Sequence, residues 1–290
     1  MISGDLSKFA DKKFGQNFLK NDTYIYKIIQ SMPDDDLSVA EIGPGLGDLT
    51  NALVKARSVT AFEVDKRLCE HLTTTFKDPI HKGKFELRCG DVLEHWESGS
   101  LLNEPYHLVA NLPYYIATNI ILKALKDELC QSVLVMVQLE VAEKFSADTG
   151  EKAFSALSVI AQTVGEAEIC FEVEPEAFIP PPKVTSAVLL IRKKISNSNE
   201  KFETFLRIAF VQPRKKLSKN LETAFPKQTV ATAFETLNLD TNLRPHEVMT
   251  SIYHQLFTIL KDTLDERRKS KPKSSKARAN NTAKQKTKST

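Results

Sequence analysis

A chain of 290 residues, of which 41% are hydrophobic, can form one large domain and a smaller one. It has no run of about 20 apolar residues that could cross a bilayer, and its amino terminus lacks the apolar core of a signal peptide, so we expect a cytoplasmic protein with no membrane partner. The 40 basic and 37 acidic residues are unevenly placed, because ten basic residues and no acidic one lie between Arg267 and the end of the chain.

The cysteines and histidines predict neither disulfides nor a metal site. Four cysteines are scattered along the chain without a Cys-x-x-Cys spacing, and six histidines are equally dispersed. This pattern favours free thiols in a reducing compartment.

The chain begins with a basic and aromatic arm over residues 12–19, followed by a helical pattern over 22–32. In this arm, Asn17 and the backbone of Leu19 are candidates to reach a ligand. An arm that only packs on the body is the alternative, since a short segment of this composition is weak evidence alone.

The first predicted strand, residues 37–42, runs into a glycine-rich turn, Gly43 to Gly47, and then into a helix over 48–55. Glycines in a strand-to-helix turn let the backbone approach a ligand closely, so Gly43 and Gly45 are candidate contacts. The Gly-x-Gly-x-Gly spacing differs from the Gly-x-Gly-x-x-Gly of dinucleotide binders, which argues against a bound pyrophosphate.

Acidic residues follow the next two predicted strands. The strand over 59–62 ends at Glu63, where a carboxylate can accept both hydroxyl protons of an adenosine ribose, and Asp65 is the nearby rival. The strand over 85–88 leads to Asp91, which can accept from an adenine amino group. A helix N-cap is the alternative role for Asp91.

The fourth predicted strand, residues 106–110, delivers the sequence Asn111-Leu112-Pro113-Tyr114. The lone pair of an exocyclic amine is delocalised into the nucleobase, and two acceptors aimed at its N–H groups would make the nitrogen more nucleophilic. Asn111 can offer a side-chain oxygen, and Leu112 or Pro113 a carbonyl. Pro113 stiffens the loop, and Tyr114 can stack on the base. An ordinary strand-to-helix turn is the alternative.

Candidates thus follow four successive strands, namely Gly43, Glu63, Asp91 and Asn111. The carboxyl ends of parallel strands meet at one edge of an open α/β sheet, where such folds bind ligands. The pattern therefore predicts an α/β, Rossmann-like fold with one site at that edge.

The remaining elements complete the sheet and add a helical unit. A fifth strand over 131–138 precedes helices over 140–146 and 154–163, and an antiparallel hairpin is predicted from 168–173 and 186–192. Between its strands, Phe178 to Val184 includes three prolines that make an extended segment. This segment could hold Phe178 against a base, although a core role is the alternative.

A polar stretch near residue 195 marks a domain boundary. We expect a domain with an amino-terminal arm over 1–195, a small helical domain over 200–264 and a disordered basic tail over 265–290. The helices are predicted over 202–210, 217–224, 230–237 and 245–264. Arg214 and Lys215 lie in a basic turn that suits phosphate contacts, with a solvated charged face as the alternative.

Together these motifs resemble the KsgA-type family of ribosomal RNA adenine dimethyltransferases. The resemblance covers nearly the whole chain except the basic tail. It is carried by Phe14 to Leu19 (FGQNFL), Glu41 to Gly47 (EIGPGLG), Glu63 to Asp65 (EVD), Gly90 and Asp91, Asn111 to Tyr114 (NLPY) and Phe178 to Val184 (FIPPPKV).

The resemblance implies a seven-stranded methyltransferase sheet, a helical RNA-binding domain and S-adenosyl-L-methionine as methyl donor. It implies dimethylation of N6 of two adjacent adenosines near the 3′ end of 16S ribosomal RNA in the small subunit, by an enzyme we expect to be a monomer. The implied cofactor-binding residues are Asn17, Leu19, Gly43, Gly45, Glu63, Asp91 and Asn111. The implied catalytic residues are Asn111, Pro113 and Tyr114, and the substrate-binding residues are Tyr114, Phe178, Arg214 and Lys215.

Two other functions stay open. A large-subunit ribosomal RNA methyltransferase of the macrolide-resistance type shares the resemblance, and a non-catalytic ribosome-assembly factor could keep the fold. A DNA adenine methyltransferase is disfavoured, because its usual motif has Asp or Asn followed by two prolines, unlike the sequence at Asn111.

Overall fold

The computed structural model describes residues 16–96, 99–196 and 199–270, with the side chains of 264–270 not described. Its strands are β1 (Phe18–Leu19), β2 (Ser38–Ile42), β3 (Val59–Glu63), β4 (Phe85–Cys89), β5 (Tyr106–Asn111), β6 (Cys130–Gln138), β7 (Gly165–Val173), β8 (Phe178–Ile179) and β9 (Ser186–Lys193). Its α-helices are α1 (Asp22–Ser31), α2 (Asp48–Ala56), α3 (Lys66–Thr75), α4 (Lys77–His81), α5 (Val92–His95), α6 (Ala117–Lys126), α7 (Leu139–Ser146), α8 (Ala156–Val164), α9 (Glu200–Ala209), α10 (Leu217–Leu221), α11 (Lys227–Thr236) and α12 (Thr250–Ser270).

Seven strands form one sheet in the order β4-β3-β2-β5-β6-β9-β7. The strands from β4 to β6 are parallel, whereas β9 runs antiparallel to both β6 and β7. The predicted α/β sheet of seven strands is therefore present. The predicted strands agree with the observed ones within a residue or two, except that β7 begins earlier, at Gly165.

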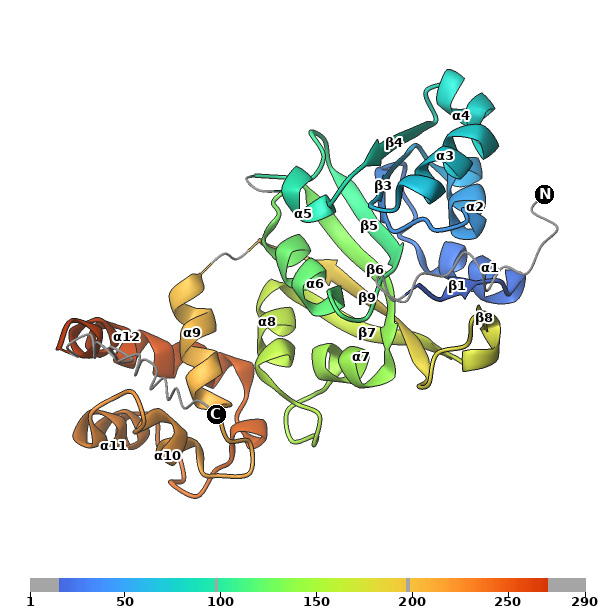
Figure 1. Ribbon diagram of the computed structural model, residues 1–290. Helices are drawn as coiled ribbons and strands as arrows, with labels where there is room; N and C mark the ends of the chain where they lie inside the picture. Colours follow the sequence, from blue (N-terminus) through green and yellow to red (C-terminus); the bar gives the residue numbers. More distant parts are fainter. Residues whose placement is uncertain (1–15, 97–98, 197–198, 271–290) are drawn as a thin grey trace, which may run out of the picture.

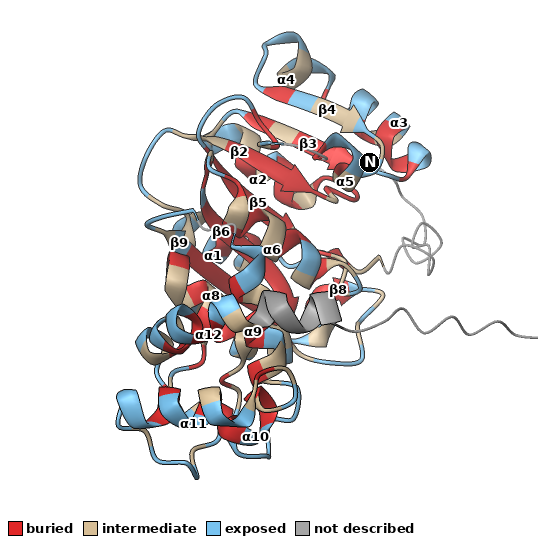
Figure 2. Ribbon diagram, turned by 90° about the vertical axis from the view of Figure 1, so that its left-hand side faces the viewer, coloured by how far each residue is buried: buried red, intermediate tan, exposed pale blue. Residues whose placement is uncertain are grey.

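The sheet is apolar on both faces because helices cover both. Successive residues of a strand point to opposite faces, and Leu108 and Ala110 of β5 pack in one core cluster while Val109 packs in the other. Helices α6, α7 and α8 supply the first cluster, and α1, α2 and α3 the second. The central strands in Figure 2 are accordingly buried along most of their length. This is why their sequences read as nearly unbroken apolar runs.

A separate two-stranded sheet joins the amino-terminal arm to the proline-rich segment. Strand β1 pairs antiparallel with β8, with Phe18 opposite Ile179 and Leu19 opposite Phe178. Both strands have two residues, too few to show a periodic pattern, and neither was expected from the sequence. The pairing brings together segments about 160 residues apart and places the arm beside the main sheet, as Figure 1 shows.

The C-terminal helices α9 to α12 gather at one end of the molecule, away from α3 and α4 (Figure 1). They share a core cluster of their own, which also takes in Val159 of α8 and Phe154 just before that helix. The predicted helix over 217–224 is shorter, and residues 245–247 form a 3-10 turn that precedes α12. Helix α12 continues to Ser270 and so extends into the range predicted as a disordered tail. The rest of that prediction, residues 271–290, lies outside the described residues.

The expectation of free thiols is wrong for one pair of cysteines. The crossover from β3 through α3 to β4 brings Cys69 and Cys89 together, and they form a disulfide. Cys130 and Cys170 are free. Within the described residues, no helix is long and apolar enough to cross a membrane.

Candidate functional site

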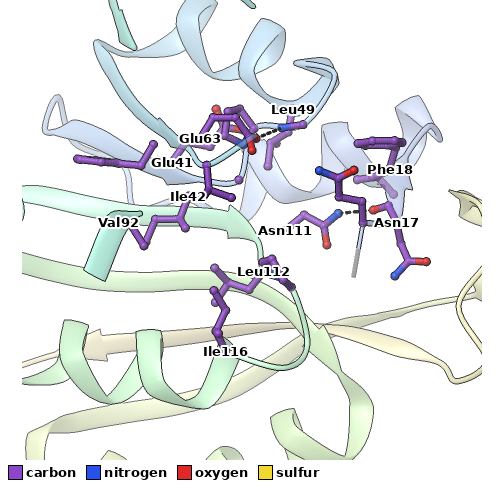
Figure 3. A pocket seen from close by; sticks show the side chains of 18 of the residues that line it. Asn17, Phe18, Glu41, Ile42, Leu49, Glu63, Val92, Asn111, Leu112 and Ile116 are labelled. Carbon is purple, nitrogen blue, oxygen red and sulfur yellow. Dashed lines mark hydrogen bonds between the residues drawn. The ribbon is translucent and has the colours of Figure 1, made fainter. Parts of the chain in front are cut away.

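A cavity of about 250 Å³ opens at the carboxyl edge of the sheet. The turn after β2, the ends of β3 and β5, the loop after β4 and the arm all contribute to its lining, as Figure 3 shows in part. It brings together Asn17, Leu19, Gly43, Gly45, Glu63, Asp91, Asn111, Pro113 and Tyr114, all of which the sequence singled out. The predicted convergence of four strand ends is therefore present in the structure.

The glycine turn forms one wall of the cavity at close range to the arm. Gly43 and Gly45 have φ of +71° and +60°, a region that side-chain-bearing residues rarely adopt. A Cβ on Gly45 would lie 3.0 Å from Cδ1 of Phe18. The absence of a side chain at residue 45 thus allows the aromatic ring of the arm to close over the turn.

Glu63 is a buried acid whose carboxylate faces the glycine turn. Its oxygens accept hydrogen bonds from the backbone N–H groups of Gly45 (3.2 Å) and Asp65 (2.9 Å). Burial raises the pKa of Glu63, and these hydrogen bonds oppose that rise. The rival acid, Asp65, instead caps α3 and forms an ion pair with Arg67 at 2.6 Å. The geometry therefore favours Glu63 as the acid that faces a ligand.

Asp91 has the N-cap role considered for it and also lines the cavity. One carboxylate oxygen caps α5 by accepting from the backbone N–H of Leu93 at 2.9 Å. The same residue lines the cavity beside Val92 and is exposed. A carboxylate has more acceptor capacity than one cap uses, so Asp91 can also accept from a ligand amine.

The side-chain amide of Asn111 has a defined orientation. Its Nδ2 donates to the backbone carbonyl of Asn17 at 2.9 Å, and because a carbonyl only accepts, the amide nitrogen must face the arm. Figure 3 shows this bond, with Leu112 and Ile116 on the other side of the loop. The amide oxygen is thereby turned away from the arm and remains an acceptor.

Backbone hydrogen bonds fix the loop that carries Asn111. The N–H of Leu112 donates to the carbonyl of Met136 on β6 at 3.1 Å, and the N–H of Ile116 donates to the carbonyl of Pro113 at 3.2 Å. The second bond uses one lone pair of the Pro113 carbonyl. The choice between Leu112 and Pro113 as a second acceptor stays a prediction.

Tyr114 is half-buried at the rim, and its hydroxyl lies 2.8 Å from the Ser186 hydroxyl. Burial raises the pKa of Tyr114, so the phenol stays neutral. The adjacent Tyr115 also lines the cavity and is 64% exposed. Two aromatic rings, one anchored and one solvated, therefore stand at the entrance.

Three predicted substrate-binding residues do not line the cavity. Phe178 is 2% exposed and belongs to the core cluster that contains Leu19 and Val173. The prediction that it stacks on a base is not met by this arrangement, because β8 places its ring in the core. Arg214 and Lys215 are exposed on the turn between α9 and α10, in the C-terminal helices.

The sequence analysis missed one buried acid at the site. Glu41 is 1% exposed, lines the cavity and accepts from the Thr50 hydroxyl at 2.7 Å. Burial raises its pKa to about 8, and the neighbouring Glu63 adds to the rise. An acidic residue inside an otherwise apolar buried strand was the available signal.

The cavity offers acceptors and apolar walls rather than metal ligands. In the part of the chain that the structure describes, no group of three or more His, Cys, Asp or Glu could hold a metal ion. The acceptors suit a polar ligand that carries hydroxyl and amine donors, with apolar surface from Ile42, Val92 and Leu112.

Comparisons with known proteins agree with this chemistry. Residues 8–262 match the family model described as Ribosomal RNA adenine dimethylase. The chain is 55% identical over 250 residues to the Ribosomal RNA small subunit methyltransferase A of Sulfurimonas denitrificans, a match that covers 86% of this chain and 93% of the relative. The protein of the same name from Aliarcobacter butzleri is 52% identical, with 87% and 97% covered.

Solved structures show the same fold. The 23S rRNA methyltransferase ErmE is 26% identical with a TM-score of 0.65, covering 84% of this chain and 100% of that one. A dimethyladenosine transferase from Plasmodium falciparum is 24% identical with a TM-score of 0.70, covering 83% and 96%. Since the family model spans both the sheet and the C-terminal helices, the resemblance seen in the sequence motifs is confirmed. The chain belongs to the ribosomal RNA adenine dimethylase family of methyltransferases.

Proposed function

We propose that this methyltransferase uses S-adenosyl-L-methionine to dimethylate N6 of two adjacent adenosines near the 3′ end of 16S ribosomal RNA in the small subunit. The observation that carries the proposal is the orientation of Asn111, whose amide nitrogen is held by the arm at 2.9 Å while its oxygen stays available as an acceptor. Curated relatives at 55% and 52% identity are named as small-subunit enzymes, which supports the choice of subunit.

The residues present fit the proposed cofactor. Glu63, buried at the end of β3, would accept from the ribose hydroxyls, and Asp91 would accept from the adenine amine. The turn at Gly43 and Gly45 lets the methionine part approach the backbone. Asn17 and Leu19 would close the site from the arm. When bound, the cofactor supplies an electrophilic methyl group on a sulfonium.

The chain's own residues would present the acceptor nitrogen. Asn111 Oδ1 and a carbonyl of Leu112 or Pro113 would accept from the adenine amine and align its lone pair with the methyl group. Tyr114 would stack on the extruded base. No strong base is required, because the methylated nitrogen is acidic and sheds its proton readily. Orientation and proximity would supply the larger part of the acceleration.

The domain organisation and RNA contacts belong to the same proposal. Residues 1–195 would bind the cofactor and the target base, and residues 200–264 would bind RNA through a basic turn that includes Arg214 and Lys215. The enzyme would act as a monomer in the cytoplasm. Phe178 would contribute as a core residue beneath the arm, as its burial indicates.

The decisive experiment is transfer of labelled methyl groups to small ribosomal subunits that lack the modification, followed by mapping of the product. We expect four methyl groups per RNA on two adjacent adenosines near the 3′ end. Methylation of a single adenosine in large-subunit RNA instead would favour the macrolide-resistance type. Cofactor binding with no transfer to either RNA would favour an assembly factor without catalysis.

A further inference from the structure

A buried serine contacts the hydroxyl of Tyr114, the residue that would stack on the target base. Ser186 is the first residue of β9, and it pairs with Gln138 at the end of β6 and with Val173 at the end of β7. Because β6 runs parallel to β5, this register places Ser186 at the same edge of the sheet as Asn111. Its side chain is 0% exposed.

The hydroxyl of Ser186 has one partner within the described residues, the hydroxyl of Tyr114 at 2.8 Å. Either hydroxyl can donate in this pair. A buried hydroxyl without a hydrogen bond is costly, and the residues that follow Ser186 in the strand, Ala187 and Val188, are apolar and buried. The Ser186 hydroxyl therefore finds its hydrogen-bond partner in Tyr114, whereas its neighbours in β9 are apolar.

This contact acts on a ring that the loop backbone alone does not fix. The hydrogen bonds at Leu112 and Ile116 hold the backbone on either side of Tyr114, but its ring can still turn about its side-chain bonds. A hydrogen bond to the phenol oxygen restricts rotation about the Cα–Cβ bond, because that rotation would carry the oxygen away from Ser186. Stacking requires the ring to lie where the base arrives, so fixing the place of the ring preorganises the site.

We propose that Ser186 is a positioning residue that holds the Tyr114 ring in the place where it receives the target adenine. This inference rests on the proposed function, since it assigns Ser186 to the same base-binding step. Ser186 acts through Tyr114 and does not contact the substrate.

The test is a double-mutant cycle with Ser186→Ala, Tyr114→Phe and the double variant. Each single variant removes one hydroxyl and keeps the ring, and the net value of a neutral hydrogen bond predicts a loss of about 3- to 10-fold in kcat/KM for RNA. We expect the double variant to be no worse than either single variant, because both remove the same contact. Cofactor affinity, measured by calorimetry, should stay unchanged in all three.

Ser132→Ala is the matched control. Ser132 is another buried serine on the same pair of strands, opposite Arg192 at the far end of the β6–β9 ladder, and its hydroxyl contacts His107 at 2.7 Å. This variant should lose stability as Ser186→Ala does, with kcat/KM unchanged. If Ser186→Ala folds poorly, Tyr114→Phe still tests the contact, because it leaves the core intact.

Fully additive losses in the cycle, or wild-type kcat/KM in Tyr114→Phe, would overturn the positioning role. An equal loss of kcat/KM in Ser132→Ala would overturn it as well, since the effect would then be one of stability. These outcomes presuppose methyl transfer by the wild-type enzyme. Failure of the wild type to methylate RNA would instead refute the proposed function itself.

Discussion

Replacing Asn111 with alanine removes two interactions that can be measured separately. The first is the 2.9 Å bond from Nδ2 to the Asn17 carbonyl, which ties the arm to the cavity. A net value of about 1 kcal/mol for such a bond predicts a loss of about 5-fold in cofactor affinity. The second is the acceptor aimed at the target amine, and loss of one preorganised group of this kind typically lowers turnover by about 100- to 1000-fold.

Asn111→Asp separates the two effects. It keeps one oxygen as an acceptor but places the other against the Asn17 carbonyl, so that two acceptors face each other without a proton between them. Both variants remove the donor to that carbonyl, and the facing acceptors in Asn111→Asp add repulsion, so cofactor affinity should fall by more than the roughly 5-fold expected for Asn111→Ala. At saturating cofactor, turnover should nevertheless fall less in Asn111→Asp than in Asn111→Ala.

Calorimetric titration of cofactor and single-turnover transfer of labelled methyl groups to immature small subunits would measure the two losses. Wild-type turnover in Asn111→Ala at saturating cofactor would refute the acceptor role. Unchanged cofactor affinity in Asn111→Asp would refute the coupling between the amide and the arm.

Three further substitutions follow from the structure. Gly45→Ala should lower cofactor affinity about 10-fold or more, because the new Cβ would lie 3.0 Å from the Phe18 ring and would displace the arm. Gly83→Ala is the control in the same calorimetric titration. Gly83 has φ +66° with open space around it, so this variant should keep wild-type cofactor affinity. Phe178→Ala should lower the free energy of unfolding in urea by about 3–5 kcal/mol, because the ring is buried. Unchanged stability together with weaker RNA binding would instead support the stacking role predicted from the sequence. Glu41→Gln should gain stability relative to wild type as pH rises from about 5 to 8, since the raised pKa makes the folded state hold a proton that the unfolded state releases. Thermal unfolding of both proteins without cofactor at pH 6 and pH 8 would check this, and an equal change in Tm for the two would contradict it.

The position of the site was predictable because parallel strands impose it. Gly43, Glu63, Asp91 and Asn111 each follow an apolar strand, and once the strands are parallel, their carboxyl ends share an edge. Residue type alone then indicated acceptors for hydroxyl and amine donors. The boundaries of the buried strands were predictable as well, because strands buried on both faces are nearly unbroken apolar runs.

Contacts between segments distant in the chain were not predictable in this way. The burial of Phe178 depends on the pairing of β1 with β8, and two-residue strands leave no periodic signal. The disulfide between Cys69 and Cys89 depends on the crossover geometry, since their spacing matches no motif. The orientation of the Asn111 amide and the partner of Tyr114 likewise depend on atoms far away in the sequence.

The attachment of the arm has a consequence for repeated turnover. Most of the cavity lining lies at the ends of β2, β3, β4 and β5 in the central sheet, whereas the arm is held by β1–β8 pairing and by side-chain contacts such as Lys20 with Asp48 at 2.6 Å. Lifting the arm would let the methyl donor enter and its demethylated product leave without disturbing the strands. The same movement would break the bond from Asn111 to Asn17 and free the amide to rotate. While the arm is lifted, such an enzyme would be inactive. Each return of the arm would restore the hydrogen bond that orients the Asn111 amide toward the substrate.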